Sequence, residues 1–274
     1  MTEDYLRSFL FVPATRPDRI AKALASGADT IIVDLEDAVP LEAKDSARAS
    51  LAEYLKTNPD ALVMVRINGA DSAQYQADIA LCKNAANITG VMLPKAADRS
   101  DIEYVSEATG KPVWPLIESA AGIASLPTLV KASGIARLSI GALDLASDLS
   151  LASNTPGAET VLDYCKCQLV IHSRAAGLAA PVETVVPVID NPEYISKVAT
   201  KANEMGFRGM LAIHPRQLPE IHQAFTPDPE QVLWAERVLE GADQFGAVFQ
   251  LDGKMIDAPV IQEAKSILAR ADLT

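Results

Sequence analysis

The chain of 274 residues is 49% hydrophobic and 22% charged, a composition typical of a globular protein. This length fits one large α/β domain, because barrels of that class commonly run to about 250 residues. The net charge of -12 and the lack of any run of Lys and Arg exclude a general nucleic-acid binder, which needs a basic surface. An anionic small-molecule substrate stays compatible with this charge, because a few local cations or a bound metal reverse the field inside one pocket.

The cysteine count and the apolar runs indicate where the protein works. Cys82, Cys165 and Cys167 are an odd number in a long chain, which indicates reduced thiols rather than a disulfide framework. The first residues, Met-Thr-Glu-Asp, are acidic where a signal peptide is basic. No apolar stretch approaches the roughly 20 residues that span a bilayer. We therefore expect a cytoplasmic protein with neither a membrane nor a nucleic acid as partner.

Eight short β-rich runs alternate with segments of helical apolar spacing. The runs are Ser8–Val12, Thr30–Asp34, Leu62–Ile67, Gly90–Leu93, Val113–Ile117, Arg137–Gly141, Ala179–Val182 and Gly209–Ile213. The helical segments are Pro17–Ser26, Leu41–Leu55, Ser72–Lys83, Ile102–Ala108, Gly122–Lys131, Ala158–Ala176 and Pro192–Glu204. This alternation predicts an α/β protein with a (β/α)8 TIM barrel. An open doubly wound sheet is the alternative that the number of strands does not exclude.

The residues that follow the strands favour the barrel. Polar side chains come after nearly every strand, as expected when the eight βα loops build one catalytic face. They are Arg16, Asp34 with Glu36, Arg66 with Asn68, Lys95, Glu118, Asp144, Glu183 and His214. No Gly-x-Gly-x-x-Gly follows a strand and no Gly-x-x-x-x-Gly-Lys-Ser/Thr occurs, which disfavours dinucleotide and P-loop sites.

A tail follows the eighth unit. Pro227–Phe245 is predicted to be helical, Phe249–Met255 to form a hairpin around Asp252-Gly253, and Ala258–Ala269 to form a final helix. The tail has too few apolar residues to fold as a separate domain. We therefore predict a barrel catalytic domain over residues 1–225. Residues 226–274 form a C-terminal helical extension that packs on the barrel or on a neighbouring subunit.

Two carboxylates follow two neighbouring strands within Val113–Ser150. Glu118 comes after Trp-Pro-Leu-Ile, and Asp144 after Leu-Ser-Ile-Gly-Ala-Leu. If both runs are parallel strands, two hard oxygen ligands stand at the same end of the sheet, which suits Mg²⁺ better than zinc. The alternative is that both residues are helix N-caps or first-turn acids.

Several motifs together resemble one family. SFLFVPATRPDRI, GADTIIVDLEDAVP, VMVRIN, GVMLPKA, LIESAAGI, IGALDLASDL, GFRGMLAIHPRQ and DGKMIDAP follow, in order, the motifs of the citrate lyase beta-subunit-like enzymes. These enzymes belong to the HpcH/HpaI aldolase/citrate lyase superfamily, with malyl-CoA and citramalyl-CoA lyases and 2-oxo acid aldolases. The resemblance covers essentially the whole chain. It implies a (β/α)8 barrel, Mg²⁺ dependence, reversible carbon–carbon cleavage, often of a 3-hydroxyacyl-CoA, and a homotrimer or hexamer.

The resemblance also implies roles for individual residues. Glu118 and Asp144 match the two metal ligands, and Arg66 matches the arginine that holds the substrate carbonyl or carboxylate. Glu36 and Asp37 match acidic residues close to the metal waters. We therefore expect Arg66 and Glu36 to be catalytic and Asp37 to bind substrate.

Three more residues complete the expected site. In related acyl-CoA lyases an aspartate near the C-terminus approaches the active site of an adjacent subunit, and Asp257 in Met-Ile-Asp-Ala-Pro matches it. Asp257 is expected to carry a proton, in its own or a neighbouring subunit's site, although Ile-Asp-Ala-Pro is also a plain N-cap sequence. Arg16 and Lys95 are expected to bind substrate.

Other polar residues near the site have structural interpretations. Asp34 is a metal ligand or the ion-pair partner of Arg66 or Lys95, and an ion pair is the ordinary use of such an arginine. Asp148 is interpreted as a first-turn acid of the next helix. His214, followed directly by proline, is interpreted as a structural histidine in the loop.

The expected function is a Mg²⁺-dependent lyase that releases a 2-oxo acid and an acyl-CoA. Two departures from the family motifs weaken the case for a CoA ester. Ala14 stands where many relatives have glycine, and a side chain there restricts the close approach of a ligand. Met210 stands where a lysine is common, and a lysine is a possible phosphate partner. The alternatives are a CoA-independent 2-oxo acid aldolase and a non-catalytic metabolite-binding subunit of a larger complex.

Overall fold

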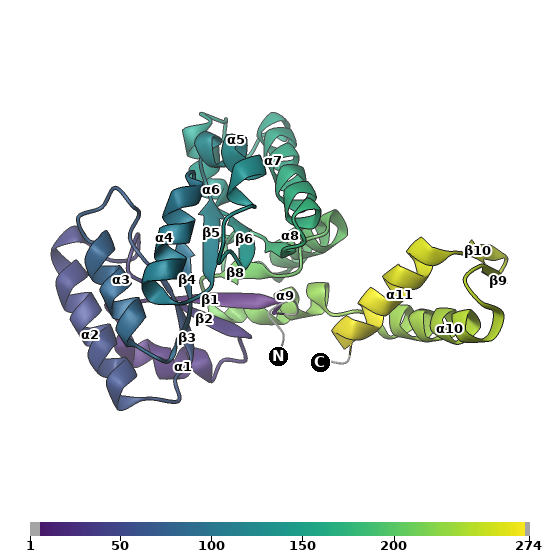
Figure 1. The fold of residues 1–274 in the computed structure, drawn as a ribbon, viewed down its shortest axis with the longest axis horizontal. Helices are drawn as coiled ribbons and strands as arrows, with labels where there is room; N and C mark the ends of the chain where they lie inside the picture. Colours follow the sequence, from purple (N-terminus) through teal and green to yellow (C-terminus); the bar gives the residue numbers. More distant parts are fainter. Residues whose placement is uncertain (1–5, 272–274) are drawn as a thin grey trace.

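The structure is a computed structural model that describes residues 6–271. Eight parallel strands form a barrel with helices around it (Figure 1). The strands are β1 (Ser8–Pro13), β2 (Thr30–Asp34), β3 (Val63–Arg66), β4 (Ile88–Leu93), β5 (Val113–Ile117), β6 (Arg137–Ile140), β7 (Ala179–Val182) and β8 (Met210–Ala212). All eight coincide with the predicted runs to within two residues at each end.

The strand order shows that the sheet is a barrel. Neighbours run β7-β6-β5-β4-β3-β2-β1-β8, and a parallel bridge between Glu183 and Met210 joins the two ends of this order. The open-sheet alternative is therefore wrong, because an open sheet has no contact between its edge strands. All strands are parallel, so their carboxyl ends meet at one face.

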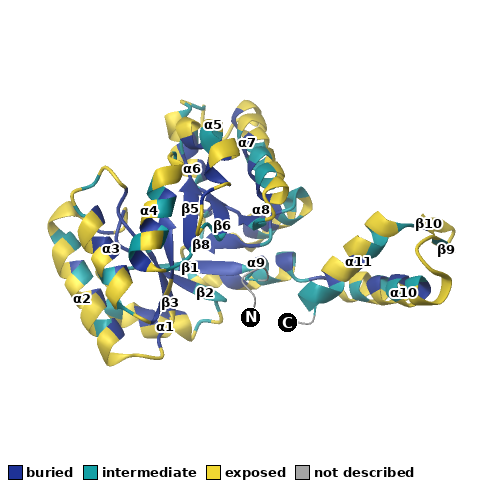
Figure 2. Cartoon of the chain, in the orientation of Figure 1, coloured by how far each residue is buried: buried dark blue, intermediate teal, exposed yellow. Residues whose placement is uncertain are grey.

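Helices cover the outside of the barrel. They are α1 (Ile20–Leu24), α2 (Lys44–Thr57), α3 (Tyr75–Asn84), α4 (Arg99–Thr109), α5 (Ala120–Leu129), α6 (Ala142–Asp148), α7 (Pro156–Ala175), α8 (Pro192–Met205) and α9 (Leu218–Phe225). Single 3₁₀ turns lie at Pro17–Arg19, Leu41–Ala43 and Pro215–Gln217. Figure 2 shows the strands buried and the outer faces of the helices exposed, as expected when apolar strands are covered on both sides. No helix among residues 6–271 is both long enough and apolar enough to cross a membrane.

The strands alternate between two cores. Odd-numbered side chains of β1 and β8, such as Phe9 and Leu211, fill the barrel interior, while Leu10, Met210 and Ala212 pack against the helices. The Phe9 and Trp114 rings lie 5.1 Å apart inside the barrel. The interior is therefore packed with side chains rather than open.

Arg137 closes the amino-terminal end of the barrel. Its guanidinium is fully buried and donates hydrogen bonds to the carbonyls of Ala180, Leu6 and Arg208, at or before three strands. It also lies against the Phe9 ring, 5.6 Å from the ring centre. This end is thus filled, and ligand space lies at the carboxyl face.

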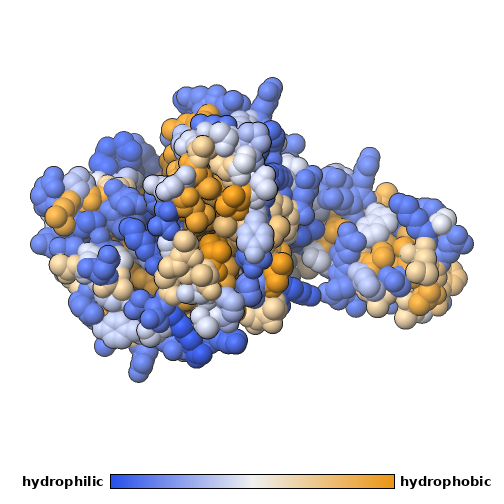
Figure 3. Space-filling model, turned by 90° about the horizontal axis from the view of Figure 1, so that it is seen from above, coloured by the Kyte–Doolittle hydropathy of each residue, from blue (hydrophilic) through white to orange (hydrophobic). Residues whose placement is uncertain are grey.

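The C-terminal extension forms an arm that projects from the barrel (Figure 1). It consists of α10 (Pro229–Phe245), β9 (Phe249–Leu251), β10 (Lys254–Ile256) and α11 (Ala258–Ala271). The hairpin turns at Asp252 and Gly253, which have φ values of 50° and 79°, as the sequence predicts. A small separate core holds the arm together, made of Ala235, Val238, Ile256, Ala264 and Ile267. Figure 3 shows apolar side chains gathered on its surface, where Leu233, Phe245, Val248 and Met255 are exposed.

Candidate active site

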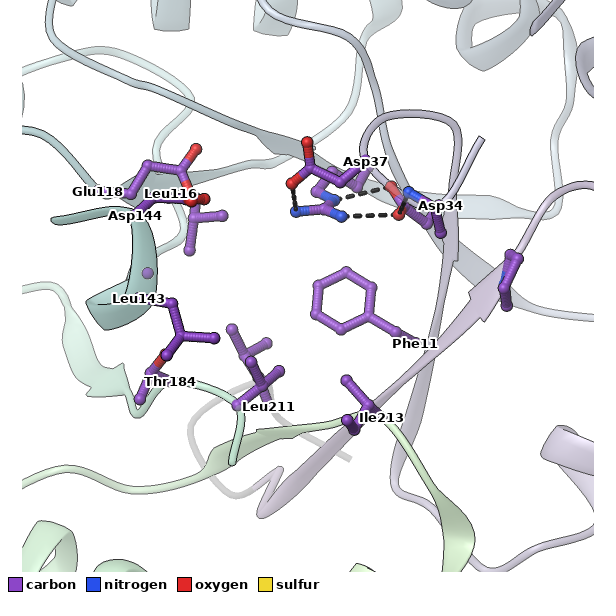
Figure 4. A pocket seen from close by; sticks show the side chains of 15 residues that line it. Phe11, Asp34, Asp37, Leu116, Glu118, Leu143, Asp144, Thr184, Leu211 and Ile213 are labelled. Atoms are coloured by element: carbon purple, nitrogen blue, oxygen red, sulfur yellow. Dashed lines mark hydrogen bonds and ion pairs between the residues drawn. The ribbon is translucent and has the colours of Figure 1, made fainter. Parts of the chain in front are cut away.

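A pocket of about 460 Å³ lies at the carboxyl ends of the strands (Figure 4). Its walls come from β1, β2, β3 and β5, from the residues that follow β6 and β7, and from β8 and the residue after it. The lining residues are Phe11, Pro13, Asp34, Asp37, Ala38, Arg66, Leu116, Glu118, Gly141, Leu143, Asp144, Thr184, Val185, Leu211 and Ile213. Six of the eight residues predicted to form the site lie in or beside this pocket. Four of them line it (Asp37, Arg66, Glu118 and Asp144), and two contact lining residues (Glu36 and Lys95).

Arg66 is held in place by Asp34. The two residues are paired in register at the ends of β3 and β2, and the guanidinium donates from Nε and Nη2 to the two Asp34 oxygens at 2.7 and 2.6 Å. Burial lowers the pKa of Arg66, but the hydrogen bonds and charge of Asp34 outweigh it and raise the pKa above its ordinary value. The same oxygens accept the backbone N–H groups of Glu36 and Ala38. Of the two sequence interpretations of Asp34, the ion pair with Arg66 is the one observed.

Glu36 joins two cations. Its Oε1 lies 2.5 Å from Lys95 Nζ and its Oε2 lies 3.1 Å from Arg66 Nη1. Burial of the carboxyl raises the pKa of Glu36, although Arg66 and Lys95 oppose the shift. Asp37 contacts Arg66 Nη1 at 3.4 Å from the rim, where its side chain is exposed. Three acids thus surround one guanidinium.

Glu118 is a buried carboxylate after β5. Its Oε1 accepts the backbone N–H of Lys95 at 2.8 Å, and Lys95 adopts a left-handed φ of 53° to present that group. Burial, together with the nearby charges of Glu36 and Asp144, raises the pKa of Glu118 to about 8, although the hydrogen bond from the Lys95 N–H opposes this shift. Such a carboxylate gains from a positive partner more than an exposed one does.

Gly141 makes room for this carboxylate. It directly follows β6, which lies beside β5, and a Cβ at position 141 would lie 2.6 Å from Glu118 Oε2 and 2.7 Å from Glu118 Cβ. Asp144 follows in the first turn of α6 and is exposed toward the same pocket. The short connection between β6 and α6 thus brings the second carboxylate beside the first (Figure 4).

Two expected site residues lie elsewhere in this single chain. Arg16 is exposed in the loop after β1 and pairs with Asp18 at 2.7 Å, and it does not line the pocket. Asp257 lies in the arm, where its Oδ1 faces the backbone N–H of Val260 at 3.5 Å at the start of α11. The arm extends away from the pocket, so Asp257 is not part of its own chain's lining.

Two sequence interpretations are clarified by the structure. Asp148 ends α6 and accepts the N–H of Ala120 at 2.7 Å, so it supports the start of α5. The expected role, stabilising the first turn of the following helix, is therefore not the one observed. His214 caps the 3₁₀ turn at Pro215–Gln217 by accepting the N–H of Arg216, which is the structural role that was predicted.

A supporting network behind the loop after β2 was not predicted from the sequence. Lys44 Nζ donates to the carbonyls of Leu35 and Glu36, each at 2.9 Å. Asn68 donates to the Leu35 carbonyl and to Asp78, which is fully buried and pairs with Arg48 at 2.7 Å. These contacts fix the loop that carries Glu36. Only Asn68, directly after a strand, gave a signal in the sequence.

The family model described as HpcH/HpaI aldolase/citrate lyase matches residues 7–215. The chain belongs to this family. A citrate lyase subunit beta-like protein of Deinococcus radiodurans is 30% identical, over 96% of this chain and 96% of the relative. A (3S)-malyl-CoA thioesterase of Cereibacter sphaeroides is also 30% identical, over 97% and 94% of the two chains. The family expected from the motifs is thereby confirmed, and with it a relation to lyases and aldolases.

A solved structure of the family has the same fold. CitE from Mycobacterium tuberculosis, in complex with magnesium, acetoacetate and coenzyme A, is 31% identical with a TM-score of 0.85, covering 97% of this chain and 98% of CitE. Other structures of that protein hold magnesium with pyruvate or with oxaloacetate. The barrel predicted from the sequence, with its C-terminal helices, is the fold of this family member.

The residues present fit a divalent cation. Five carboxylates (Asp34, Glu36, Asp37, Glu118 and Asp144) meet two cations (Arg66 and Lys95) around one pocket, which leaves an excess of negative charge. Oxygen donors are the ligands that Mg²⁺ prefers. No group of three or more His, Cys, Asp and Glu side chains within residues 6–271 is placed to hold a metal. A metal between Glu118 and Asp144 would therefore keep positions for water and substrate oxygens.

Proposed function

We propose that this chain is a Mg²⁺-dependent carbon–carbon lyase. It cleaves a 3-hydroxyacyl-CoA such as citramalyl-, malyl- or citryl-CoA into an acyl-CoA and a 2-oxo acid, or forms it in the reverse direction. The observation that carries the proposal is the Arg66 guanidinium, fixed by Asp34, in the same pocket as the Glu118 and Asp144 carboxylates. The magnesium, acetoacetate and coenzyme A bound to CitE support it.

Glu118 and Asp144 are the residues that would hold Mg²⁺. When bound, the ion polarises the carbonyl of the 2-oxo acid as a Lewis acid. Glu118 must lose its proton to bind a cation, and the Lys95 N–H keeps its Oε1 turned to one side. Gly141 leaves the space in which that carboxylate lies.

Arg66 stabilises the charge that develops during cleavage. The substrate hydroxyl gives its proton to Asp257 of a neighbouring copy, the bond from the hydroxyl-bearing carbon to the carbon alpha to the thioester breaks, and its electron pair moves onto the thioester as an enolate. Asp34 accepts two of the five N–H donors of Arg66, and Nη1 faces Glu36 and Asp37, so the second Nη2 hydrogen is the donor left for the enolate oxygen. One preorganised donor of this kind contributes roughly 3 kcal/mol. The enolate carbon then takes up a proton to give the acyl-CoA.

The remaining predicted residues have supporting roles in this proposal. Glu36 holds Lys95 and Arg66 in place, and Lys95 and Asp37 at the rim bind polar groups of the substrate. Arg16, beyond the pocket but on the same face, binds the more distant part of a long substrate. Its weak, exposed pair with Asp18 leaves it open to exchange for an anion.

Asp257 carries the proton in the site of a neighbouring copy. The arm that bears it points away from its own pocket and exposes Phe245, Val248 and Met255. Exposed apolar side chains of this size favour burial against another subunit. A homotrimer or hexamer, with the arm of one chain over the barrel of the next, places Asp257 where the proposal needs it.

The test is turnover by the purified chain with Mg²⁺ and each of the three acyl-CoA substrates, measured as release of the 2-oxo acid. Glu118→Ala and Asp144→Ala abolish turnover if these residues hold the metal. Glu107→Gln, which removes an exposed acid from α4, is the matched control with normal turnover. Activity that survives both EDTA and the two substitutions refutes the metal mechanism.

The same assay separates the alternatives. A CoA-independent aldolase cleaves a free 2-oxo acid aldol and shows no binding of CoA esters at millimolar concentration. A non-catalytic subunit binds a 2-oxo acid without turnover on any substrate. The Asp257→Asn variant is expected to bind substrate but to lose most of kcat. Normal turnover by this variant would mean that Asp257 only caps the helix.

A further inference from the structure

The pocket is divided into a charged half and an apolar half. Asp34, Asp37, Arg66, Glu118 and Asp144 lie on the side of β2, β3, β5 and the β6–α6 connection. The opposite wall, from β7 through β8 to β1, presents only apolar side chains and one hydroxyl (Figure 4). Its members are Phe11, Pro13, Thr184, Val185, Leu211 and Ile213. Leu143 on α6 extends this wall at the rim.

This apolar wall is open to a ligand rather than buried in the core. Ile213 and Leu143 are 40% and 54% exposed, although both are large aliphatic side chains. Phe11 is half-buried, and its ring lies 4.8 Å below the Arg66 guanidinium. A ligand that reaches Arg66 therefore passes along the apolar wall, and covering these side chains stabilises the complex.

The one cation among the lining residues of the described chain is Arg66, which lies over the Phe11 ring at one end of this wall. Asp34 holds two of its N–H groups on the charged side. The lining residues further along the wall, Thr184, Val185, Leu211 and Ile213, carry no charge. Lys95 pairs with Glu36, also on the charged side. The Thr184 hydroxyl accepts the N–H of Ala142 at 3.1 Å and carries no charge. A second carboxylate of a ligand would lose its hydration here without gaining a partner.

We infer that the 2-oxo acid handled by this site carries an uncharged alkyl substituent, as pyruvate and 2-oxobutanoate do, and that dicarboxylic oxo acids are disfavoured. This inference rests on the proposed function, because the carboxylate and carbonyl of the acid must lie on the charged side. The substituent then lies against Phe11, Leu211 and Ile213. The inference chooses between acids that the solved CitE complexes leave open, since those contain both pyruvate and oxaloacetate.

The test is calorimetric titration of the Mg²⁺-loaded protein with matched pairs of acids. 2-Oxobutanoate and oxaloacetate differ by a methyl against a carboxylate, and 2-oxopentanoate and 2-oxoglutarate differ in the same way one methylene further out. The alkyl member of each pair is expected to bind at least tenfold more tightly, because the wall solvates no charge. Equal or tighter binding of the dicarboxylic members overturns the inference and leaves the proposed function standing. Failure of every 2-oxo acid to bind removes the proposed function as well.

A charge placed in the wall provides a second test. Ile213→Arg adds a cation at a position exposed enough to accept it, and the preference within each pair should move at least tenfold toward the dicarboxylic acid. Ile171→Arg adds the same charge at an exposed site on α7, outside the pocket, and should leave the preference unchanged. A shift of equal size in both variants means that overall charge, not the wall, sets the preference, and refutes the inference.

Discussion

The affinity of the site for Mg²⁺ should depend on pH through Glu118. Burial raises the pKa of this carboxyl to about 8, and the charges of Glu36 and Asp144 act in the same direction. A proton on Glu118 competes with the metal, because a carboxylic acid is a poor ligand. Raising the pH through about 8 therefore strengthens binding, and lowering it weakens binding by about tenfold per pH unit.

The magnitude follows from the ionised fraction. With a pKa of about 8, roughly 76% of Glu118 is ionised at pH 8.5 and roughly 3% at pH 6.5. The apparent dissociation constant for Mg²⁺ should therefore rise about 25-fold between these pH values, equivalent to about 2 kcal/mol. Isothermal titration of the metal-free protein with MgCl₂ at several pH values measures this change directly, and proton release on binding at pH 6.5 gives an independent measure.

Variants distinguish Glu118 from other titrating groups. Glu118→Gln removes the competing proton, so its residual Mg²⁺ affinity should be weak and nearly independent of pH. Glu107→Gln on α4 should retain the full dependence, because its side chain lies outside the pocket. A flat profile between pH 6.5 and 8.5 in the unmodified protein refutes the assignment of Glu118 as a ligand with a raised pKa.

Three further changes test other parts of the structure. Asp34→Asn keeps the shape of the residue but loosens Arg66, so kcat should fall about 10- to 100-fold while Mg²⁺ affinity is unchanged; a loss of Mg²⁺ affinity instead argues for Asp34 as a ligand. Gly141→Ala places a methyl group 2.6 Å from Glu118 Oε2, so calorimetric Mg²⁺ affinity should fall at least tenfold, and wild-type affinity contradicts the role given to this glycine. Ile256→Ala opens a cavity in the small core of the arm and should destabilise the arm by about 2–4 kcal/mol, so limited proteolysis should cut within residues 226–274 while the barrel stays intact. Cleavage of the barrel at the same rate would mean that the arm and the barrel do not unfold separately.

The strands were predictable because each is a short apolar run bounded by turn residues. Two barrel helices were missed. α6 has seven residues and begins directly after Gly141, in a segment interpreted mainly through Asp144. α9 has eight residues and carries a proline in its first turn, so its apolar residues repeat over too few turns to indicate a helix. Short helices are set by their packing on the barrel more than by their own sequence pattern.

The site residues were predictable by type and place, but not by partner. Asp34 had several possible roles in the sequence, and only the register of β2 against β3 selects Arg66. The fit of Gly141 around Glu118 likewise depends on how β5 packs beside β6. Neither contact has a local sequence signal, because each joins residues more than 20 positions apart.

The alternation of side chains along β8 was a signal in the sequence that was not applied to Met210. Its replacement of a lysine was expected to remove a phosphate partner, but Met210 is buried between β8 and the helices and does not line the pocket. Strand side chains alternate, so Leu211 and Ile213 face the pocket and Met210 and Ala212 face outward. Ala14 is likewise buried, and its backbone φ is not positive, so its backbone conformation does not require glycine. These two departures therefore say nothing against a CoA ester.

The balance of charge explains why the metal and the substrate are interdependent. Arg66 and Lys95 are already paired with Asp34 and Glu36, so neither adds much free positive charge to the pocket. A 2-oxo acid is an anion, and in the metal-free pocket it would meet the carboxylates of Glu118 and Asp144 on the side where its own oxygens must lie. A divalent cation between them reverses the local field, while the apolar wall of Phe11, Leu211 and Ile213 is unaffected. Under the proposed function, binding of the acid depends on the metal and discrimination between acids depends on the opposite wall, so substitutions on the two sides should act on different measured quantities.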